Sequence, residues 1–229
     1  MNSRFSDFKA GVADSWPMCL AYVPIAMLWG TLAAAKGFSP LEALFMSVFV
    51  YAGASQFVAI EMWRVPIPIV LLVFTIFIIN LRHVLYAASI SRHMDLIPKR
   101  LQPFLIYILT DEAWALAERR ALSQPLTLGY YLGVAGPLWP TWFISSGIGA
   151  YIGTIMPDPA LIGLDFAFAA MFIAILAGFW KGPRTGAIII TSAVVAVLAK
   201  SFISGAWYIV LGGVAGVAVA ALLHKEQEI

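Results

Sequence analysis

Charged residues are scarce in this sequence, and their scarcity sets the class of protein. Asp, Glu, Lys and Arg make up 11% of its 229 residues, whereas 62% are hydrophobic. A soluble domain has about 25% charged and about 45–50% apolar residues. A chain with so few charges cannot cover a globular surface that faces water, so we expect a lipid bilayer to be its solvent. Every charged stretch is short, which excludes a separate soluble enzymatic domain.

Cysteine and histidine are also rare. The single cysteine, Cys19, excludes a disulfide framework, and with only three histidines beside it a Cys-rich metal site is excluded too. A net charge of +2 gives no reason to expect a nucleic-acid partner. The chain has no phosphate-binding P-loop motif, so ATP is not its direct energy source. We therefore expect neither a metal nor another cofactor.

Long apolar runs fill most of the chain. A helix that crosses a membrane needs about 20 apolar residues, so the length suits seven or eight spans. We expect an all-α, polytopic membrane helix bundle. The runs that carry little or no charge are 17–35, 39–60, 66–91, 102–117, 121–157, 160–180, 185–199 and 201–223.

Prolines punctuate these runs and predict broken helices. Pro17 follows Ser15-Trp16 and suits the first turn of a helix. Pro24 lies inside the same run and is expected to kink it, because proline removes a backbone hydrogen bond. The run 121–157 is too long for one straight span, and Pro137 and Pro140 are expected to break it.

The basic residues give a first orientation. The positive-inside rule places Arg4/Lys9, Arg119/Arg120, Lys181/Arg184 and Lys225 on the cytoplasmic side. The basic cluster at 92–100 conflicts with simple alternation from that start. Either a short element between 66 and 120 does not cross the membrane, or the rule is violated there; the sequence leaves both open.

The chain matches itself at an offset of 123 residues. Trp16-Pro17 falls on Trp139-Pro140, Gly30-Thr31 on Gly153-Thr154, and Leu41-Glu42 on Leu164-Asp165. We expect a duplicated unit with halves starting near 15 and 138, inverted if the first half contains an odd number of crossings. Secondary transporters are commonly built from such repeats. Channels can share the symmetry, and chance similarity between apolar segments remains the alternative.

Ionisable groups inside apolar runs need an explanation, because each costs about 2.5–3.5 kcal/mol at the centre of a span. Glu42 has one, since Ser39-Pro40-Leu41-Glu42 reads as a capping box. No explanation as simple exists for three other acidic residues, Asp165, Asp111 and Glu112. We expect these three, together with His83, to be candidate proton carriers. For Asp111 and Glu112 the alternative is a surface pair with a nearby arginine.

The stretch YAGASQF, residues 51–57, interrupts an apolar run with small and polar residues. Gln56 needs hydrogen-bond partners in hydrocarbon, and unwound backbone at membrane depth is tolerated where it lines a cavity or is buried in protein. We expect a helix break here that forms part of a binding site. The candidate binding residues are Tyr51, Gly53, Ser55, Gln56, Asn80 and Arg82. The alternatives are a helix-packing patch, and for the arginine a side chain that extends to the interface.

Three blocks in this order resemble one known family: ALFMSVFVYAGASQF, FIINLRHVLYAASI and LTDEAWAL, at 43–57, 77–90 and 109–116. Together they are similar to the AzlC/YgaZ family of branched-chain amino acid exporters. The resemblance covers most of residues 10–120 and carries few landmarks after about 155. It implies a multi-pass protein of the bacterial inner membrane that exports branched-chain amino acids, with the proton gradient as the expected energy source.

The resemblance also implies a small membrane subunit of the AzlD/YgaH type. The spacing of Gly212 and Gly216 permits close helix contact with such a partner or, equally, within the chain. We expect one transporter domain over 1–229, with repeat 1 at about 10–95, a connecting element at about 100–120 and repeat 2 at about 130–223.

Two other functions stay open at this point. A passive channel for small polar solutes would show the same apolar spans and repeat. An intramembrane serine hydrolase would use Ser55 of Gly53-Ala54-Ser55 as its nucleophile and His83 as its base. This pattern is weak in a chain rich in glycine, alanine and serine.

Overall fold

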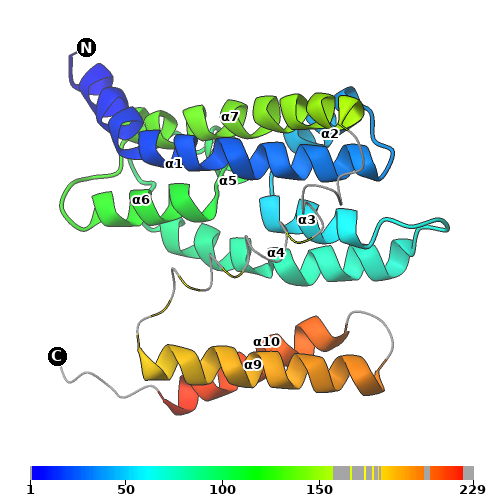
Figure 1. Cartoon of the computed structure of the whole chain (residues 1–229). Coiled ribbons are helices and arrows are strands. Elements are labelled where there is room, and N and C mark those ends of the chain that lie inside the picture. The colour runs from blue at the N-terminus through cyan, green and yellow to red at the C-terminus, as the bar shows by residue number, and fades with distance from the viewer. Residues whose placement is uncertain are drawn as a thin grey trace. The chain divides into compact units, whose positions relative to one another are not determined.

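Helices are the only regular secondary structure in the described part of the chain. The computed structural model describes residues 2–156, 182–203 and 207–223, together with 166, 173, 177 and 180. The all-α prediction is confirmed for these residues, whereas Asp165 lies outside them. The helices are α1 (Asn2–Ala35), α2 (Pro40–Phe49), α3 (Gly53–Glu61), α4 (Ile69–Ser91), α5 (Gln102–Tyr107), α6 (Asp111–Ala121), α7 (Leu128–Ile155), α9 (Pro183–Phe202) and α10 (Trp207–Leu222) (Figure 1).

Three described segments are long and apolar enough to cross a membrane: Phe5–Ala35, Ile69–Ser91 and Pro183–Phe202. The chain divides into two compact units. The first comprises Met1–Trp63 and Ile79–Ala167, and the second comprises Arg64–Ile78 and Phe168–Ile229. The candidate binding residues all belong to the first unit, so its construction comes first.

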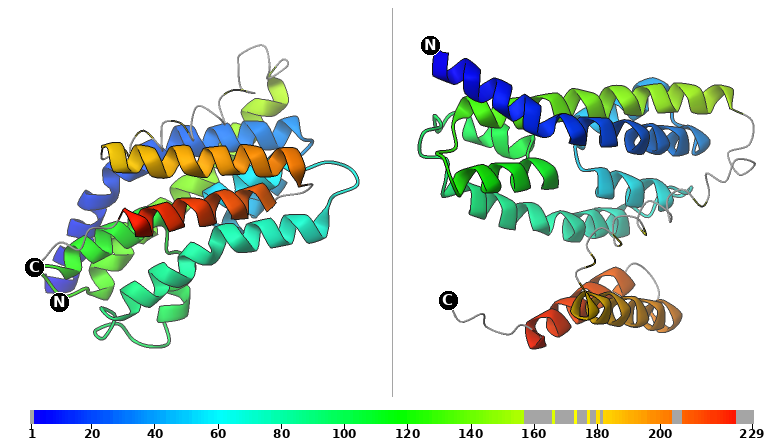
Figure 2. Two further views of the ribbon diagram at one scale, coloured as in Figure 1. Left: turned by 90° about the horizontal axis from the view of Figure 1, so that it is seen from below. Right: turned by 60° about the vertical axis from the view of Figure 1, so that its left-hand side comes forward.

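Helices α1 and α7 pack side by side along most of their length (Figures 1 and 2). Glycines allow their backbones to touch: a Cβ added to Gly11 would lie 2.3 Å from the carbonyl oxygen of Tyr130, and one added to Gly149 would lie 2.1 Å from that of Met27. Both numbers rise together along the two helices, so α1 and α7 run parallel in nearly constant register. Contacts between small residues of this kind are how helices associate in lipid, where apolar burial drives nothing.

The breaks expected at Pro137 and Pro140 are not found, because both residues lie inside the continuous helix α7. Pro17 and Pro24 lie inside α1, so Pro17 does not mark a helix start, and the kink expected at Pro24 stays a prediction. The helix also does not begin at Ser15, whose hydroxyl instead donates to the carbonyl oxygen of Gly133 at 3.3 Å. That carbonyl lies four residues before Pro137 and has lost its helical partner to the proline. The neighbouring helix replaces the missing donor, so α7 continues.

Helices α2 and α3 form a hairpin. The capping-box prediction is confirmed, because Ser39 accepts from the amide of Glu42 and the Glu42 carboxylate accepts from the amide of Ser39. Residues 50–52 are not helical, so the run is broken at the start of YAGASQF. Ring centroids of Phe38 and Trp63 lie 4.8 Å apart, which brings the two open ends of the hairpin together. Each arm rises only about 15 Å, half of a bilayer core.

Helices α5 and α6 form a second hairpin, which the sequence did not lead us to expect. Residues 108–110 interrupt the helix, and Thr110 caps α6 by accepting from the amide of Ala113. The hydroxyl of Tyr131, near the start of α7, donates to the carbonyl oxygen of Leu105 at 2.7 Å. Helix α6 then returns toward the start of α1, where Arg119 lies 3.3 Å from Asp14.

The two hairpins enter from opposite ends of the α1–α7 pair and meet at its middle. The hydroxyl of Tyr107, at the end of α5, donates to the carbonyl oxygen of Val48 in the last turn of α2. The second hairpin also bears on the basic cluster at 92–100. His93 lies 3.4 Å from Glu118, so the cluster at 92–100 lies at the same end as the close of α6.

Ion pairs fix the second hairpin to α1 and α7. Arg120 lies 3.1 Å from Asp7, which also accepts from the hydroxyl of Thr127 at 2.8 Å. The guanidinium of Arg120 lies 4.7 Å from the ring centroid of Tyr130, a cation–π contact. One side chain therefore connects α6 with the first turns of both long helices.

The second unit contains the α9–α10 pair. The hydroxyl of Ser192 donates to the carbonyl oxygen of Gly212 at 2.8 Å. A Cβ on Gly212 would lie 3.0 Å from that of Ala196, and one on Gly216 would lie 3.4 Å from that of Ser192. The glycine pair that the sequence singled out therefore packs against α9 within the chain, the second of its two predicted uses.

The α1–α7 contact predicts opposite effects for two glycine-to-alanine substitutions. Gly30→Ala places a Cβ 2.0 Å from the carbonyl oxygen of Ser146, whereas a Cβ on Gly136 meets nothing within 4 Å. We expect Gly30→Ala to lower the unfolding free energy by about 1–3 kcal/mol, and Gly136→Ala to raise it by up to about 1 kcal/mol through helix propensity. Thermal unfolding in detergent measures both; equal effects would contradict the close contact.

The ion pairs predict unequal roles for two neighbouring arginines. The Arg120–Asp7 side chains are 18% and 23% exposed, whereas those of Arg119 and Asp14 are 64% and 40% exposed. We expect Arg120→Ala to lower stability by about 1.5–3 kcal/mol and Arg119→Ala by less than about 1 kcal/mol. The same unfolding assay ranks the two variants, and the reverse order would contradict the assignment.

Candidate functional site

The tip of the first hairpin presents the beginning of α3. Ala52 precedes the helix and makes no side-chain capping bond. The first turn of a helix carries free N–H groups and a partial positive charge. Both favour an anionic group, and Gly53, Ala54 and Ser55 supply the first three amides.

Gly53 is required by its neighbour. A Cβ at this position would lie 2.8 Å from Cη2 of Trp142, whose ring packs against the start of α3. A larger residue would push the hairpin tip away from α7. The glycine therefore allows a close approach between a backbone and an aromatic ring in the middle of the unit.

Gln56 is fully buried, and both ends of its amide are bonded. Its Nε2 donates to Oγ of Ser47 at 3.0 Å, and its Oε1 accepts from Nε1 of Trp142 at 2.7 Å. The side chain thus joins α2, α3 and α7. Ser55, also fully buried, donates to Oδ1 of Asn80 at 3.0 Å and joins α3 to α4. The polar residues of YAGASQF hold the hairpin tip in place.

Arg82 and Asp111 form an ion pair. Nη1 of Arg82 lies 2.6 Å from Oδ2 of Asp111, and the side chains are 33% and 41% exposed. The pair connects α4 to the first turn of α6. It does not match the predicted alternative for Asp111, a pair with the nearby arginine, because Arg119 pairs with Asp14 instead.

Glu112 points to a different partner. Its Oε2 accepts a short hydrogen bond from the hydroxyl of Tyr22 on α1. The ring of Tyr22 meets Trp142 edge to face, with centroids 5.3 Å apart. No local pattern pointed to Tyr22 or Trp142, because each is one aromatic residue in an apolar run and its role depends on a distant segment.

Two more polar side chains lie in this region. Tyr51 is 6% exposed, and its hydroxyl lies beside that of Tyr22. His83 lies beside the backbone of Asn80, and its ring is 5.9 Å from that of Tyr86. Both side chains keep hydrogen-bonding capacity to spare, which suits the binding of another group.

The predicted binding residues therefore lie at or beside the tips of the two hairpins. Two of the predicted proton carriers, Asp111 and Glu112, lie there as well. Asp165 lies outside the described residues. The described part of the chain contains no group of His, Cys, Asp and Glu residues suited to a metal ion.

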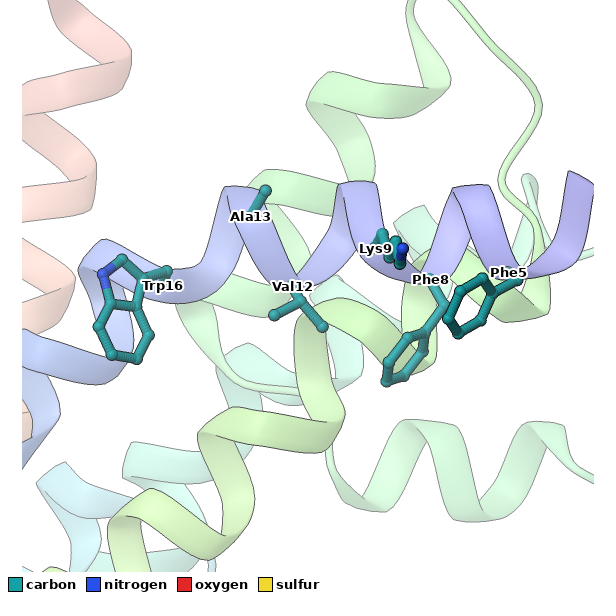
Figure 3. Close-up of a pocket in the computed structure, with 6 residues that line it drawn as sticks. All are labelled: Phe5, Phe8, Lys9, Val12, Ala13 and Trp16. Atoms are coloured by element: carbon teal, nitrogen blue, oxygen red, sulfur yellow. The ribbon is translucent and has the colours of Figure 1, made fainter.

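An apolar depression lies elsewhere, on the surface of α1 (Figure 3). It is lined by residues of this helix alone: Phe5, Phe8, Lys9, Val12, Ala13 and Trp16. Phe5 and Trp16 are 62% and 60% exposed, as is typical of residues that contact lipid at an interface. With Lys9 as its one charged group, this depression lacks the paired polar groups of the hairpin tips.

The buried amide of Gln56 predicts a large effect of Gln56→Leu. The substitution leaves Nε1 of Trp142 without its acceptor in a buried site, which costs about 1–3 kcal/mol. We expect thermal unfolding in detergent at a clearly lower temperature than for the wild type. Gln124→Leu, at an exposed position, is the matched control. If both variants unfold like the wild type, the Gln56 bridge is not formed in the folded protein.

Comparison with known proteins identifies the family. The family model described as AzlC protein matches residues 17–156, which include both hairpins. The inner membrane protein YgaZ of Escherichia coli (strain K12) is 31% identical over 223 residues, 95% of this chain and 90% of YgaZ. The chain is thus a homologue of an inner membrane protein.

Two further relatives also match most of the chain. The branched-chain amino acid transport protein AzlC of Bacillus subtilis (strain 168) is 22% identical over 233 residues, all of this chain and 91% of that protein. An uncharacterized membrane protein of Archaeoglobus fulgidus is 30% identical over 194 residues, 84% of each chain. No solved structure matches. The family match over more than half of the chain and the near full-length similarity to YgaZ show that the chain belongs to the AzlC family.

Proposed function

We propose that the protein is a secondary transporter that exports branched-chain amino acids, of the valine, leucine and isoleucine class, from the bacterial cytoplasm across the inner membrane. The observation that carries the proposal is the meeting of two helical hairpins from opposite ends of the α1–α7 pair, with polar side chains gathered at their tips. Half-helices that end near the midplane are a recurring way to build a substrate site in transporters. The transport activity named for the Bacillus relative supports the same substrate class.

The architecture that fits this function is a single transporter domain over 1–229. We propose eight membrane segments, of which the α2–α3 and α5–α6 hairpins enter without crossing. Two crossings, α1 and α4, then precede α7. If the duplication of about 10–95 in about 130–223 is real, its halves are parallel, in keeping with the parallel packing of α1 and α7.

The polar groups at the tips suit a zwitterion. The free amides at the start of α3 and the guanidinium of Arg82 favour a carboxylate. Aromatic walls such as Tyr51 and Trp142 suit a branched aliphatic side chain. We propose that the substrate contacts the residues predicted from the sequence, with the bridging side chains of Ser55 and Gln56 shaping the site: Tyr51, Gly53, Ser55, Gln56, Asn80 and Arg82.

We further propose that protons drive export through the acidic groups beside this site. Asp111 and Glu112 lie at the start of α6, with His83 on the neighbouring α4, and Asp165 is the fourth candidate. A proton taken up by one of these groups would change the charge next to the substrate. The wild-type ion pair between Arg82 and Asp111 supports such a coupling, because changing either charge affects the other.

A small AzlD/YgaH-type subunit is the partner that we propose. Since Gly212 and Gly216 face α9, this subunit would use other apolar surfaces. Val214 and Val217, on the same helix, are 61% and 71% exposed.

The two alternative functions are less well supported. Ser55 donates to Asn80 and makes no bond with His83, so the nucleophile and base of a hydrolase are not paired. A passive channel remains the competing proposal, and transport against a gradient distinguishes it from a carrier.

Transport by purified protein tests the proposal. We expect inverted vesicles or proteoliposomes to accumulate labelled leucine when a proton gradient is imposed, and to lose the accumulation when an uncoupler collapses it. Equilibration of leucine without accumulation would indicate a channel. Full activity of this chain alone would argue against an obligatory subunit, whereas activity only with the small subunit would support one.

The acidic pair predicts the coupling phenotype. Asp111→Asn together with Glu112→Gln should abolish gradient-driven accumulation, because neither side chain can then exchange a proton. Glu42→Gln, at an exposed capping residue outside the site, is the control and should transport nearly as well as the wild type. Normal pH-dependent transport by the double variant would contradict the assignment of coupling to these residues.

A further inference from the structure

The charges at the hairpin tips do not balance within the described residues. The guanidinium of Arg82 neutralises Asp111 at 2.6 Å. Glu112, the next residue of α6, is bonded to the neutral hydroxyl of Tyr22, and no described Lys, Arg or His forms an ion pair with it. One carboxylate therefore remains without a cation in the middle of the unit. Glu112 is half-buried, and a partly desolvated charge is stabilised when a cation lies beside it.

A second and independent feature lies beside this carboxylate. Tyr51 is only 6% exposed, and its hydroxyl lies beside the hydroxyl of Tyr22, which donates to Glu112. Tyr51 also interacts electrostatically with the Glu112 carboxylate. A hydroxyl oxygen offers two lone pairs to a donor. A buried hydroxyl that donates to Tyr22 keeps these lone pairs free, and beside a carboxylate without a cation they suit a cationic donor that is not part of the chain.

We propose that Glu112, Tyr22 and Tyr51 form a subsite that binds the ammonium group of the transported amino acid. The proposal rests on the proposed function and assigns one end of its substrate. Glu112 supplies the charge, and the two tyrosine hydroxyls accept from the remaining N–H groups while Tyr22 keeps the carboxylate in position. The C-terminus of α2, with its free carbonyl groups, also lies at the tip of the α2–α3 hairpin and favours a cation.

The ammonium subsite can be compared with the α3 amides that we propose for the carboxylate of the substrate. Trp142 touches Gly53 at the start of α3 and meets Tyr22 edge to face, and Tyr22 is bonded to Glu112. The free amides of α3 and the Glu112 carboxylate are thus linked through Trp142 and Tyr22. The carboxylate and ammonium groups of an α-amino acid are attached to the same carbon, so its two binding subsites belong to one region of the protein.

Three probes separate the two ends of the substrate. Binding of L-leucine, 3-methylbutylamine and 4-methylpentanoate to the purified full-length chain is measured by calorimetry at one fixed pH. The amine lacks the carboxylate, and the acid lacks the ammonium group. The variants are Glu112→Gln, Tyr51→Phe and Tyr22→Phe. Glu118→Gln, two turns further along α6 and bonded to Ser89, is the matched control.

The expected result is selective. Glu112→Gln should weaken leucine and the amine by at least about tenfold, in line with a lost charged hydrogen bond, and should change binding of the acid by less than about twofold. The two tyrosine variants should weaken leucine and the amine by a smaller factor. Glu118→Gln should bind all three probes like the wild type. This selectivity would not follow from a merely structural role, which would affect the acid as well.

Other outcomes would overturn either the ammonium subsite or the proposed substrate class. Unchanged leucine affinity in Glu112→Gln, or an equal loss for leucine and the acid, overturns the ammonium subsite while leaving amino acid transport intact. Binding of the amine but not of leucine by the wild type, lost in Glu112→Gln, overturns the proposed substrate class and keeps the cation site. If the wild type binds none of the three probes, both proposals fail.

Discussion

The contact between α1 and α7 is the constraint on which the first unit depends. Glycines at matched positions bring the two backbones within touching distance, and the helices remain parallel from one end to the other. None of the four arms of the hairpins is long enough to cross a bilayer alone, so each needs a surface to lie against. The long pair provides that surface, and the hairpins reach it from opposite ends because α4 carries the chain back between them.

Broken helices at membrane depth leave backbone groups that lipid cannot satisfy. This chain satisfies part of them with side chains from other segments. The hydroxyl of Tyr107 donates to a carbonyl oxygen in the last turn of α2, and Thr110 caps α6. Ser15 replaces the backbone donor that Pro137 removed from α7. The start of α3 has no side-chain cap. The region that we propose to bind substrate therefore includes backbone amides that the α3 cap residue does not satisfy.

Local signals in the sequence were sufficient for some features and not for others. The capping box at Ser39 and the interruption at the start of YAGASQF depend on neighbouring residues, and the structure contains both. Pro137 misled because its effect depended on Ser15, on a helix more than 100 residues away in the sequence, which no local pattern reveals. The break before α6 could have been found, because Thr110 followed by two acidic residues is a typical helix start. Tyr22 and Trp142 could not, since their importance arises only from tertiary contact.

The meeting of the hairpin tips has an electrical consequence. Solvent that reaches the tips from both ends would leave only a thin layer of protein between two conducting phases, around Tyr107 and Val48. Most of the membrane voltage would then fall across that layer, and a unit charge that passes it would gain or lose about 2.3 kcal/mol per 100 mV. A zwitterion carries no net charge through this field, whereas a proton moving the other way, as we propose, carries one. Exchange of the two would thus be electrogenic, with the voltage acting on the proton alone.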